Sequence, residues 1–441
     1  MNQIRYFLLV RKPIGRMIRF MLIESIVRNT LGLKRHCVKK VRNEEGHLLI
    51  YLVPDKRYKL ICSQCGAKGP GYDTLNERQW KHVPLWGIPV LLIYKPRRVQ
   101  CAVCGIKVEA IPWTKGKSSL SLPLSVFLAT WAREVAWQVV GRLFGFHWNT
   151  VRKAVKDVVD YGLRHREMSD VLYIGIDEIS RRKGHIYHTQ VYDLIEKRLL
   201  WSGEDRSAET LEAFCDELGK EHCEQIEAIC CDMWAPYADV IKTRFPNALL
   251  VFDKFHIVRH LMDAVDTVRK EEARELKAED PDLLKKTRYI WLKNPWNLTD
   301  QQKVRLSDLE KLNLKINRSY LLKEAFRKFW DYIYPAWARK YLNQWFWWAT
   351  HSRLEPMRNF AWLIRRHQED ILSYFKVPID NGSVEALNNK AKAISHRAFG
   401  YRTAHTFKLA LYHGMGKLPM PKLTHRFLCP RFRRLSVITT R

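Results

Sequence analysis

Leu172-Tyr-Ile-Gly-Ile-Asp-Glu-Ile179 is an apolar, β-branched stretch that predicts a buried strand carrying an acidic residue, Asp177, near its end. The polar residues 181–185 predict a turn, and the alternating pattern over 186–194 predicts a second strand, so the two segments form an expected hairpin. Two more apolar runs, 226–232 and 248–253, end in Asp232 and Asp253. Carboxylates collected at strand ends suggest a metal site.

The order of the elements around this stretch indicates the fold class. A third strand is expected at 197–203, a helix at 207–218 with Ser207 as its cap, and another helix opening at Pro236. Three strands, a helix, a strand, a helix and a strand is the order of an α/β, ribonuclease H-like domain, in which the first and fourth strands are neighbours. That order would place Asp177 beside Asp232.

The charge of the chain points to its partner. The 441 residues predict two to four domains, and 76 Lys and Arg against 46 Asp and Glu give a net charge of +30 that runs through every segment. Such an excess favours a nucleic-acid partner, although charge alone would also fit a basic RNA- or ribosome-associated protein. No apolar stretch approaches the ~20 residues that span a bilayer, and the N-terminus does not resemble a signal peptide, so we expect a cytoplasmic protein.

Two cysteine pairs have the spacing of metal ligands. Cys62-Ser-Gln-Cys65-Gly66 and Cys101-Ala-Val-Cys104-Gly105 each let two thiolates reach one ion, and the glycine permits the tight turn. Four thiolates complete a tetrahedral structural zinc site, so a zinc ribbon is expected. The alternatives are a redox pair or unrelated buried thiols, and the doubling of the motif disfavours both.

A helical segment follows the cysteine pairs. Residues 134–144 predict one helix, 145–147 a break, and 148–159 a second helix with Asn149 or Thr150 near its N-cap, which is helix-turn-helix spacing. In that motif the second helix enters the major groove. The alternative is an ordinary helical hairpin with a solvated basic face. The residues expected to meet DNA are Trp148, Asn149, Thr150, Arg152 and Lys153.

A third acid is expected from a helix far along the chain. Ser383 is a good N-cap, Glu385 falls in the first turn, and Asn388 and Lys392 share roughly one face with it. The nearest competing acids are Glu178 and Asp380. Before this helix, residues 258–375 predict an all-helical insertion whose tryptophans are expected to be mostly core, with one or two free to stack on an unpaired base.

These motifs together resemble a known family. Gly175-Ile-Asp177-Glu, Cys231-Asp232-Met-Trp-Ala-Pro-Tyr, Val251-Phe-Asp-Lys-Phe-His256 and Ser383-x-Glu385-x-x-Asn388-x-x-x-Lys392, behind a zinc ribbon and a helix-turn-helix, resemble the DDE transposases of bacterial insertion sequences, in particular the ISL-three family. The resemblance implies a catalytic triad of Asp177, Asp232 and Glu385. Lys392 matches a lysine that holds the transposon end in related enzymes, but the tyrosine and arginine that precede the glutamate there have no clear match.

The resemblance also implies an activity. The expected protein binds inverted terminal repeats as a homo-oligomer on double-stranded DNA, and cuts and joins strands with two Mg²⁺ (or Mn²⁺) ions held by the three acids. Asp253 and His256 could assist proton transfer, contact a phosphate or only orient the fold. Arg181 and Arg182 could touch the DNA backbone or form a solvated turn. The alternative functions are a non-catalytic regulator derived from a transposase and a structure-specific nuclease.

The expected organisation follows the chain in order. It comprises a lead-in (1–50), a zinc ribbon (51–112), a helix-turn-helix domain (120–166), the first part of the ribonuclease H-like domain (170–257), the helical insertion (258–375), the helix with the third acid (376–412) and a basic tail (413–441).

Overall fold

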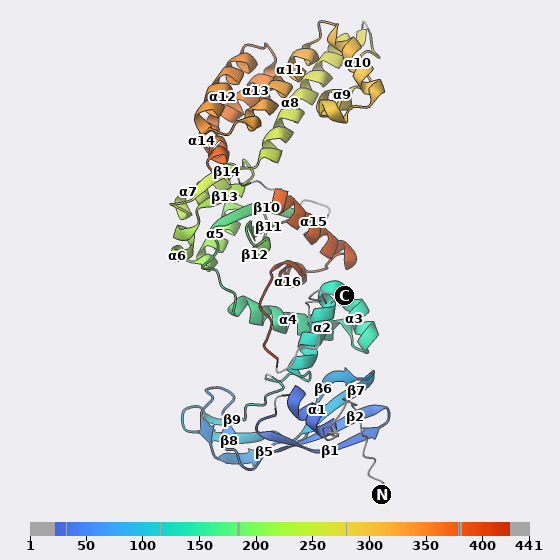
Figure 1. The fold of residues 1–441 in the computed structure, drawn as a ribbon, viewed down its shortest axis with the longest axis vertical. Helices are drawn as coiled ribbons and strands as arrows, with labels where there is room; N and C mark the ends of the chain where they lie inside the picture. The colour runs from blue at the N-terminus through green and yellow to red at the C-terminus, as the bar shows by residue number, and fades with distance from the viewer. Residues whose placement is uncertain are drawn as a thin grey trace, which may run out of the picture. The chain divides into compact units, whose positions relative to one another are not determined.

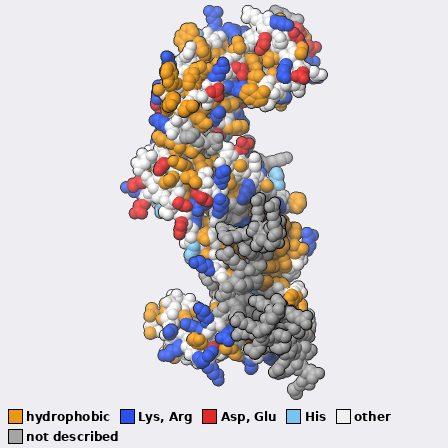
Figure 2. Space-filling view, viewed as in Figure 1, with side chains coloured by type: hydrophobic (Ala, Val, Ile, Leu, Met, Phe, Trp, Pro, Cys, Tyr) orange, Lys and Arg blue, Asp and Glu red, His pale blue; other side chains and the backbone are white. Residues whose placement is uncertain are grey.

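The chain folds into two compact units. The computed structural model describes residues 23–31, 33–114, 116–182, 186–278, 280–377, 379 and 382–423. The first unit contains residues 1–166 and 418–441, and the second contains 167–417. Of the turn expected at 181–185, residues 181 and 182 instead belong to a strand, while 183–185 and the competing acid Asp380 lie outside the described residues. Lys and Arg side chains are spread over both units on the face shown in Figure 2.

The first unit opens with a four-stranded sheet. Helix α1 (Ile23–Thr30) precedes β1 (His36–Glu44) and β2 (His47–Pro54), and the strand order is β1-β2-β7-β6, with β6 at Arg78–Leu85 and β7 at Ile88–Tyr94. Trp80, Leu92 and Trp113 are fully buried in its core. The boundary expected between residues 50 and 51 falls inside β2. This strand pairs in parallel with β7, which lies in the sequence between the two cysteine pairs, so the four-stranded sheet combines residues from both sides of the expected boundary.

The cysteine-bearing part is built from short strands. It contains β3 (Leu60–Ile61), β4 (Lys68–Gly69), β5 (Gly71–Thr74), β8 (Arg97–Cys101) and β9 (Gly105–Val108). β3 pairs with β4, while β5, β8 and β9 form a three-stranded sheet. Each cysteine pair therefore lies at the turn of a small hairpin, the first between β3 and β4 and the second from the end of β8 to the start of β9.

Three helices complete the first unit. They are α2 (Leu122–Glu134), α3 (Trp137–Phe144) and α4 (Trp148–Arg164). The predicted break is confirmed, since Gly145 ends α3 with a φ of 69°, a conformation that favours glycine. One detail of the prediction is wrong, since Glu134 ends α2 rather than opening α3. The N-cap of α4 is His147, near Asn149 and Thr150 as predicted, and its side chain accepts a hydrogen bond from the Asn149 amide.

The second unit is built on a five-stranded mixed sheet. Its strands are β10 (Tyr173–Arg182), β11 (Ile186–Asp193), β12 (Arg198–Glu204), β13 (Ala228–Cys231) and β14 (Leu249–Phe252), in the order β12-β11-β10-β13-β14. β10 to β12 are antiparallel, whereas β13 is parallel to both β10 and β14. The predicted strands and the adjacency of the first and fourth strands are confirmed.

Helices connect these strands along the chain. α5 (Ala208–Leu218) is capped by Ser207 as predicted, and α7 (Ala235–Arg244) has Pro236 in its first turn. A short helix, α6 (Lys220–Gln225), lies between α5 and β13 and was not predicted. Leu211, Phe214, Tyr237 and Ile241 bury their side chains in the core of this unit.

A helical insertion follows β14. The long helix α8 (Lys254–Glu275) begins beside β14 and extends away from the sheet into the other helices (Figure 1). These are η1 (Leu276–Ala278), α9 (Arg288–Leu292), η2 (Pro295–Asn297), α10 (Asp300–Glu310), α11 (Lys315–Arg327), η3 (Lys328–Asp331), α12 (Pro335–Thr350), α13 (Glu355–Arg366), α14 (Gln368–Leu372) and η4 (Ser373–Phe375). In the described part of the chain, no helix is long and apolar enough to cross a membrane.

The tryptophans of the insertion are less buried than predicted. Three of the eight, Trp291, Trp330 and Trp345, are buried in the core. The other five are exposed, so the prediction that most are core residues is wrong. Helical spacing identifies a shared face but does not tell whether that face is covered. The exposed residues are Trp296, Trp337, Trp347, Trp348 and Trp362.

Two further helices return to the sheet. α15 (Gly382–Arg397) packs against β10, and α16 (Ala404–Met415) packs against β12 and α15. The approach of α15 depends on Gly175, because a Cβ there would lie 2.5 Å from a methyl carbon of Val384. Helix α15, which comes late in the sequence, thereby lies beside strand β10 (Figure 1).

Candidate active site

Asp177 is a half-buried carboxylate on the central strand β10. Its Oδ1 accepts the backbone amide of Glu178 at 2.7 Å, and its Oδ2 accepts the side-chain amide of Asn388 on α15 at 2.6 Å. The carboxamide oxygen of Asn388 in turn accepts the hydroxyl of the buried Tyr192 at 2.7 Å. Burial raises the pKa of Asp177, although the hydrogen bond from Glu178 opposes that effect.

Asp232 directly follows β13, the parallel neighbour of β10. Its Oδ1 accepts the backbone amide of Met233 at 2.6 Å, and the Arg206 guanidinium lies 3.4 Å from its other oxygen. Nδ1 of His256 is 3.8 Å from Oδ1. The parallel pairing of the two strands therefore places Asp177 and Asp232 near each other, at the end of the sheet where β13 terminates.

Glu178 is a half-buried acid held by a cation. Its side chain alternates with that of Asp177 along β10, and its carboxylate pairs with Nε of Arg206 at 3.0 Å. Burial raises the pKa of Glu178 to about 7, although the Arg206 charge opposes the rise. Arg206 thus bridges Glu178 and Asp232, and its guanidinium lies 4.7 Å from the centre of the Trp234 ring.

Asp253 and His256 form a pair at the start of α8. Asp253 is buried and caps the helix by accepting the Phe255 amide at 3.1 Å, and its other oxygen lies 2.9 Å from Nδ1 of His256. Burial alone would lower the pKa of His256, but the hydrogen bond to Asp253 and the charge of Asp232 outweigh it, so the pKa is raised. The pair connects α8 to the edge that carries Asp177 and Asp232.

Glu385 and Lys392 lie on the exposed side of α15. Glu385 precedes Asn388 by one turn and Lys392 follows it by one turn, so both flank the contact with Asp177. The three predicted acids do not gather as tightly as the cysteines do. Over the described residues, the only set of three or more metal-binding side chains with ligand atoms within 4.8 Å of one another is the cysteine cluster.

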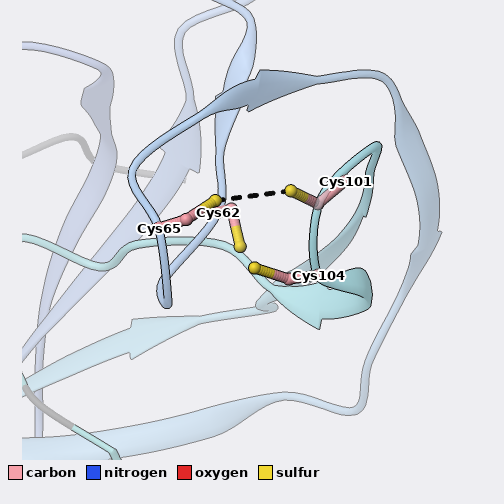
Figure 3. Close-up of side chains that lie close together, drawn as sticks. All are labelled: Cys62, Cys65, Cys101 and Cys104. Atoms are coloured by element: carbon pink, nitrogen blue, oxygen red, sulfur yellow. Dashed lines mark hydrogen bonds between the residues drawn. The ribbon is translucent and has the colours of Figure 1, made fainter.

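The four cysteines converge on one point. Cys62, Cys65, Cys101 and Cys104 have their sulfur atoms within 4.8 Å of one another, and the side chains point toward a common centre (Figure 3). The sulfurs of Cys65 and Cys101 are 3.5 Å apart. A tetrahedral ion with Zn–S bonds of about 2.3 Å needs sulfurs about 3.8 Å apart, so the cluster fits a structural zinc ion.

Comparison with known proteins agrees with this geometry. A family profile described as a transposase, of the ISL3 type of DDE enzymes, matches residues 174–411, which cover the sheet, the insertion and α15. A second profile, described as the zinc-finger of transposase IS204/IS1001/IS1096/IS1165, matches residues 60–104. The chain belongs to the ISL3 family of DDE transposases. The four-cysteine cluster is accordingly the zinc ribbon of this family.

Two curated relatives extend the similarity over most of the transposase. The chain is 31% identical over 398 residues to the transposase for insertion sequence element IS1001 of Bordetella parapertussis, covering 89% of this chain and 98% of the relative. It is 29% identical over 410 residues to the transposase for insertion sequence element IS1557 of Mycobacterium tuberculosis, covering 86% of this chain and 92% of the relative. At this coverage, the similarity to the two relatives includes residues of both compact units of the chain.

The predicted DNA-contacting residues of the transposase differ in exposure. All five on α4 lie in its first two turns; Trp148, Asn149 and Lys153 are exposed, whereas Thr150 and Arg152 are half-buried. Arg181 is also half-buried, and its guanidinium donates to the backbone carbonyls of residues 401 and 402 at 3.4 and 3.3 Å. The side chain of Arg182 lies outside the described residues.

Some residues of the candidate site had no assigned role in the sequence. Arg206 precedes α5 and reaches two acids on separate strands, and no local pattern marks such a long-range contact. Tyr192 is an ordinary strand residue in the sequence, yet its hydroxyl holds the carboxamide of Asn388. Asn388 was noted in the sequence for the helix face that it shares with Glu385 and as part of the family motif, but its contact with Asp177 was not predicted.

Proposed function

We propose that Asp177, Asp232 and Glu385 are the catalytic acids of this transposase. The observation that carries the proposal is the contact between Asn388 and Asp177, which brings the Glu385-bearing helix α15 to the strand next to Asp232. The order β12-β11-β10-β13-β14, with β13 and β14 parallel to the central strand β10 and β11 antiparallel to it, supports a ribonuclease H-like domain interrupted by the helical insertion after β14.

The donor set suits Mg²⁺ or Mn²⁺. These hard ions take oxygen ligands, and Asp177 and Asp232 offer carboxylate oxygens on adjacent strands with Asp253 nearby. Negative charges that approach one another in a half-buried place repel, and a divalent cation relieves that repulsion. When bound by these acids, Mg²⁺ or Mn²⁺ would supply activation of water or of a 3′-hydroxyl and stabilisation of the charge on the leaving oxygen.

The surrounding residues keep the acids in position. The Asn388 carboxamide orients Asp177, and Arg206 orients Asp232 while it neutralises part of its charge. Asp253 fixes the ring of His256 beside Asp232, where the imidazole can hold a proton at Nε2 or donate to a phosphate oxygen. Lys392, exposed one turn beyond Asn388, is placed to contact a phosphate of the transposon end.

The first unit supplies DNA recognition in this proposal. The exposed Trp148, Asn149 and Lys153 at the N-terminal end of α4 face the major groove, with Thr150 and Arg152 supporting them. Arg181 and Arg182, at the end of β10, lie near the DNA backbone. Because two transposon ends must be joined, we infer a homo-oligomer on terminal repeats.

Cleavage of a labelled duplex carrying the element's own terminal repeat tests the function. Wild-type protein with Mg²⁺ is expected to nick at the element boundary, and EDTA or Asp232→Ala should abolish the nick. Asp239→Ala, which removes an exposed acid of α7, is the matched control and should cut normally. Sequence-specific binding without any cut would instead identify a regulator. Cutting that ignores the repeat would identify a structure-specific nuclease.

A further inference from the structure

A basic pocket lies at the C-terminal end of α15, beyond Lys392. Its volume is about 520 Å³, and its wall is formed by the end of β10, the last turns of α15 and the start of α16. Arg181, Lys392 and His396 contribute nitrogen-bearing side chains to the wall, and Phe399 stands at its rim. The pocket lacks acidic lining residues in the described structure, so its charge suits an anionic occupant.

Phe399 has an unusual conformation. Its φ is 54°, in the left-handed region, and the Gly400 amide donates to the Ser395 carbonyl at 2.8 Å while the Phe399 amide donates to the His396 carbonyl at 2.9 Å. These bonds form the helix-ending motif in which the residue at the Phe399 position is most often glycine. A phenylalanine there is strained, and the fold alone would be better served by glycine.

Phe399 is also the most exposed large apolar residue of the described chain. Its exposed fraction is 101%, against 58% for Trp337 and 61% for Phe255. A ring in full contact with water contributes nothing to the core. Strain and full exposure at one residue, beside a basic pocket, are features of a residue kept for contact with a partner.

We propose that Phe399 stacks on a base of the bound DNA while Lys392 and His396 contact the adjoining phosphates. This inference rests on the proposed function, which places DNA along α15. Aromatic rings bind bases of any sequence through their faces, and neighbouring cations bind the backbone, which is the combination found at the end of α15. The occupant of the pocket is thus a nucleotide.

The helix geometry indicates where that base lies. Phe399 follows Glu385 by 14 residues, which is about 21 Å along a helix. DNA rises 3.4 Å per base pair, so this distance corresponds to roughly six base pairs. The stacked base is therefore expected within about six positions of the cleavage point.

Duplexes carrying 2-aminopurine at each of these positions report the stacking directly. They are titrated with full-length Asp232→Ala protein, so that binding is measured without cleavage. One position is expected to change its fluorescence on binding. Adding Phe399→Leu should remove that change and weaken binding about 5- to 100-fold, as loss of one base stack implies. Phe399→Tyr should retain both, and Tyr289→Ala, at another exposed aromatic residue, should change neither.

Folding and self-association of the Phe399 variants are measured separately. Phe399→Gly should melt at the same temperature as wild type or higher, because glycine adopts the positive φ at this position without strain. That result would show that the fold does not need the Phe399 ring. A fluorescence change that survives Phe399→Leu, or no change at any position, would overturn the proposal. So would an altered oligomeric state of the Phe399→Leu protein in the absence of DNA. Failure of the proposed function would give a different result: the fluorescence change would still depend on Phe399, but the wild-type protein would not cut the duplex.

Discussion

The side-chain amide of Asn388 donates a 2.6 Å hydrogen bond to the carboxylate of Asp177, which lies 211 residues earlier in the chain. The same carboxamide accepts the Tyr192 hydroxyl, so its orientation is fixed at both ends. The contact ties the helix that carries Glu385 to the strand that carries Asp177, and Asn388 is therefore a positioning residue for the proposed site.

Loss of this contact should slow cleavage more than it weakens binding. We expect Asn388→Ala to lower the rate of nicking about 10- to 100-fold, because an acid that has lost its orienting partner no longer holds the productive geometry. DNA affinity should stay within about twofold, as measured by titration under non-cleaving conditions. Asn389→Ala removes the exposed neighbour and should cut like wild type. Equal rates for the two variants would contradict the role of Asn388.

Removal of zinc should unfold the cysteine-bearing part of the first unit. Metal analysis is expected to find one zinc per chain in wild type and none in Cys101→Ser, since three thiolates leave the tetrahedral site incomplete. Binding of structural zinc is worth about 10–16 kcal/mol in small domains, so the variant should lose a cooperative melting transition. Cys37→Ser, outside the cluster, is the control. Zinc retained at full stoichiometry in Cys101→Ser would exclude a four-thiolate site.

Lys153 should contribute a phosphate contact to DNA binding. If the exposed ammonium on α4 neutralises one phosphate, Lys153→Ala should reduce the slope of log K against log salt by about 0.9 and weaken binding to all sequences alike. Lys156, three residues later, is paired with Asp160, so Lys156→Ala is the matched control and should leave the slope unchanged. An unchanged slope for Lys153→Ala would place that side chain away from the DNA.

The second unit should lose stability in mild acid because of His188. Burial, followed by the charges of Arg181 and Lys408, lowers the pKa of His188 to about 4, whereas an unfolded histidine titrates near 6.5. Between these values the unfolded chain binds the extra proton, so the contribution of His188 to the free energy of unfolding falls by up to about 3 kcal/mol as pH drops from 6.5 to 4. The raised pKa of Glu178 acts in the opposite direction over part of this range. Above pH 7 the effect is absent.

Urea unfolding at several pH values measures this dependence. His188→Phe should become more stable relative to wild type as pH falls from 6.5 to 4, because its ring can fill the buried site against Phe407 without binding a proton, and the His188 nitrogens have no hydrogen-bond partner among the described residues. His405→Gln, at an exposed histidine, should keep the wild-type profile. Parallel profiles for wild type and His188→Phe would show that another group causes the acid sensitivity.

The sequence predicted those parts of the fold that local patterns encode. The strands that precede Asp232 and Asp253 are continuous apolar runs because they are buried on both faces, and such runs are easy to recognise. The cysteine pairs are equally local, since each knuckle needs only a four-residue spacing and a glycine with positive φ, as at Gly66 and Gly105.

Parts that depend on distant contacts were not predicted. β1 contains three basic residues and an acid, and its exposed residues do not alternate, so its sequence alone does not identify it as a strand. The strand is evident only from its pairing with β2. Arg206 meets Glu178 and Asp232 only because separate strands come together. The exposure of five tryptophans in the insertion likewise depends on which helix faces are covered.

The separation between Asp177 and Asn388 has a consequence for synthesis. A ribosome that adds about 5–20 residues per second needs roughly 10–40 s to make the 211 residues between them. During this interval β10 and its aspartate can leave the ribosome, but the helix that orients the aspartate does not yet exist. A nascent or truncated transposase that lacks α15 therefore carries an unassembled site, and the capacity to cut DNA is acquired only after this helix has been made.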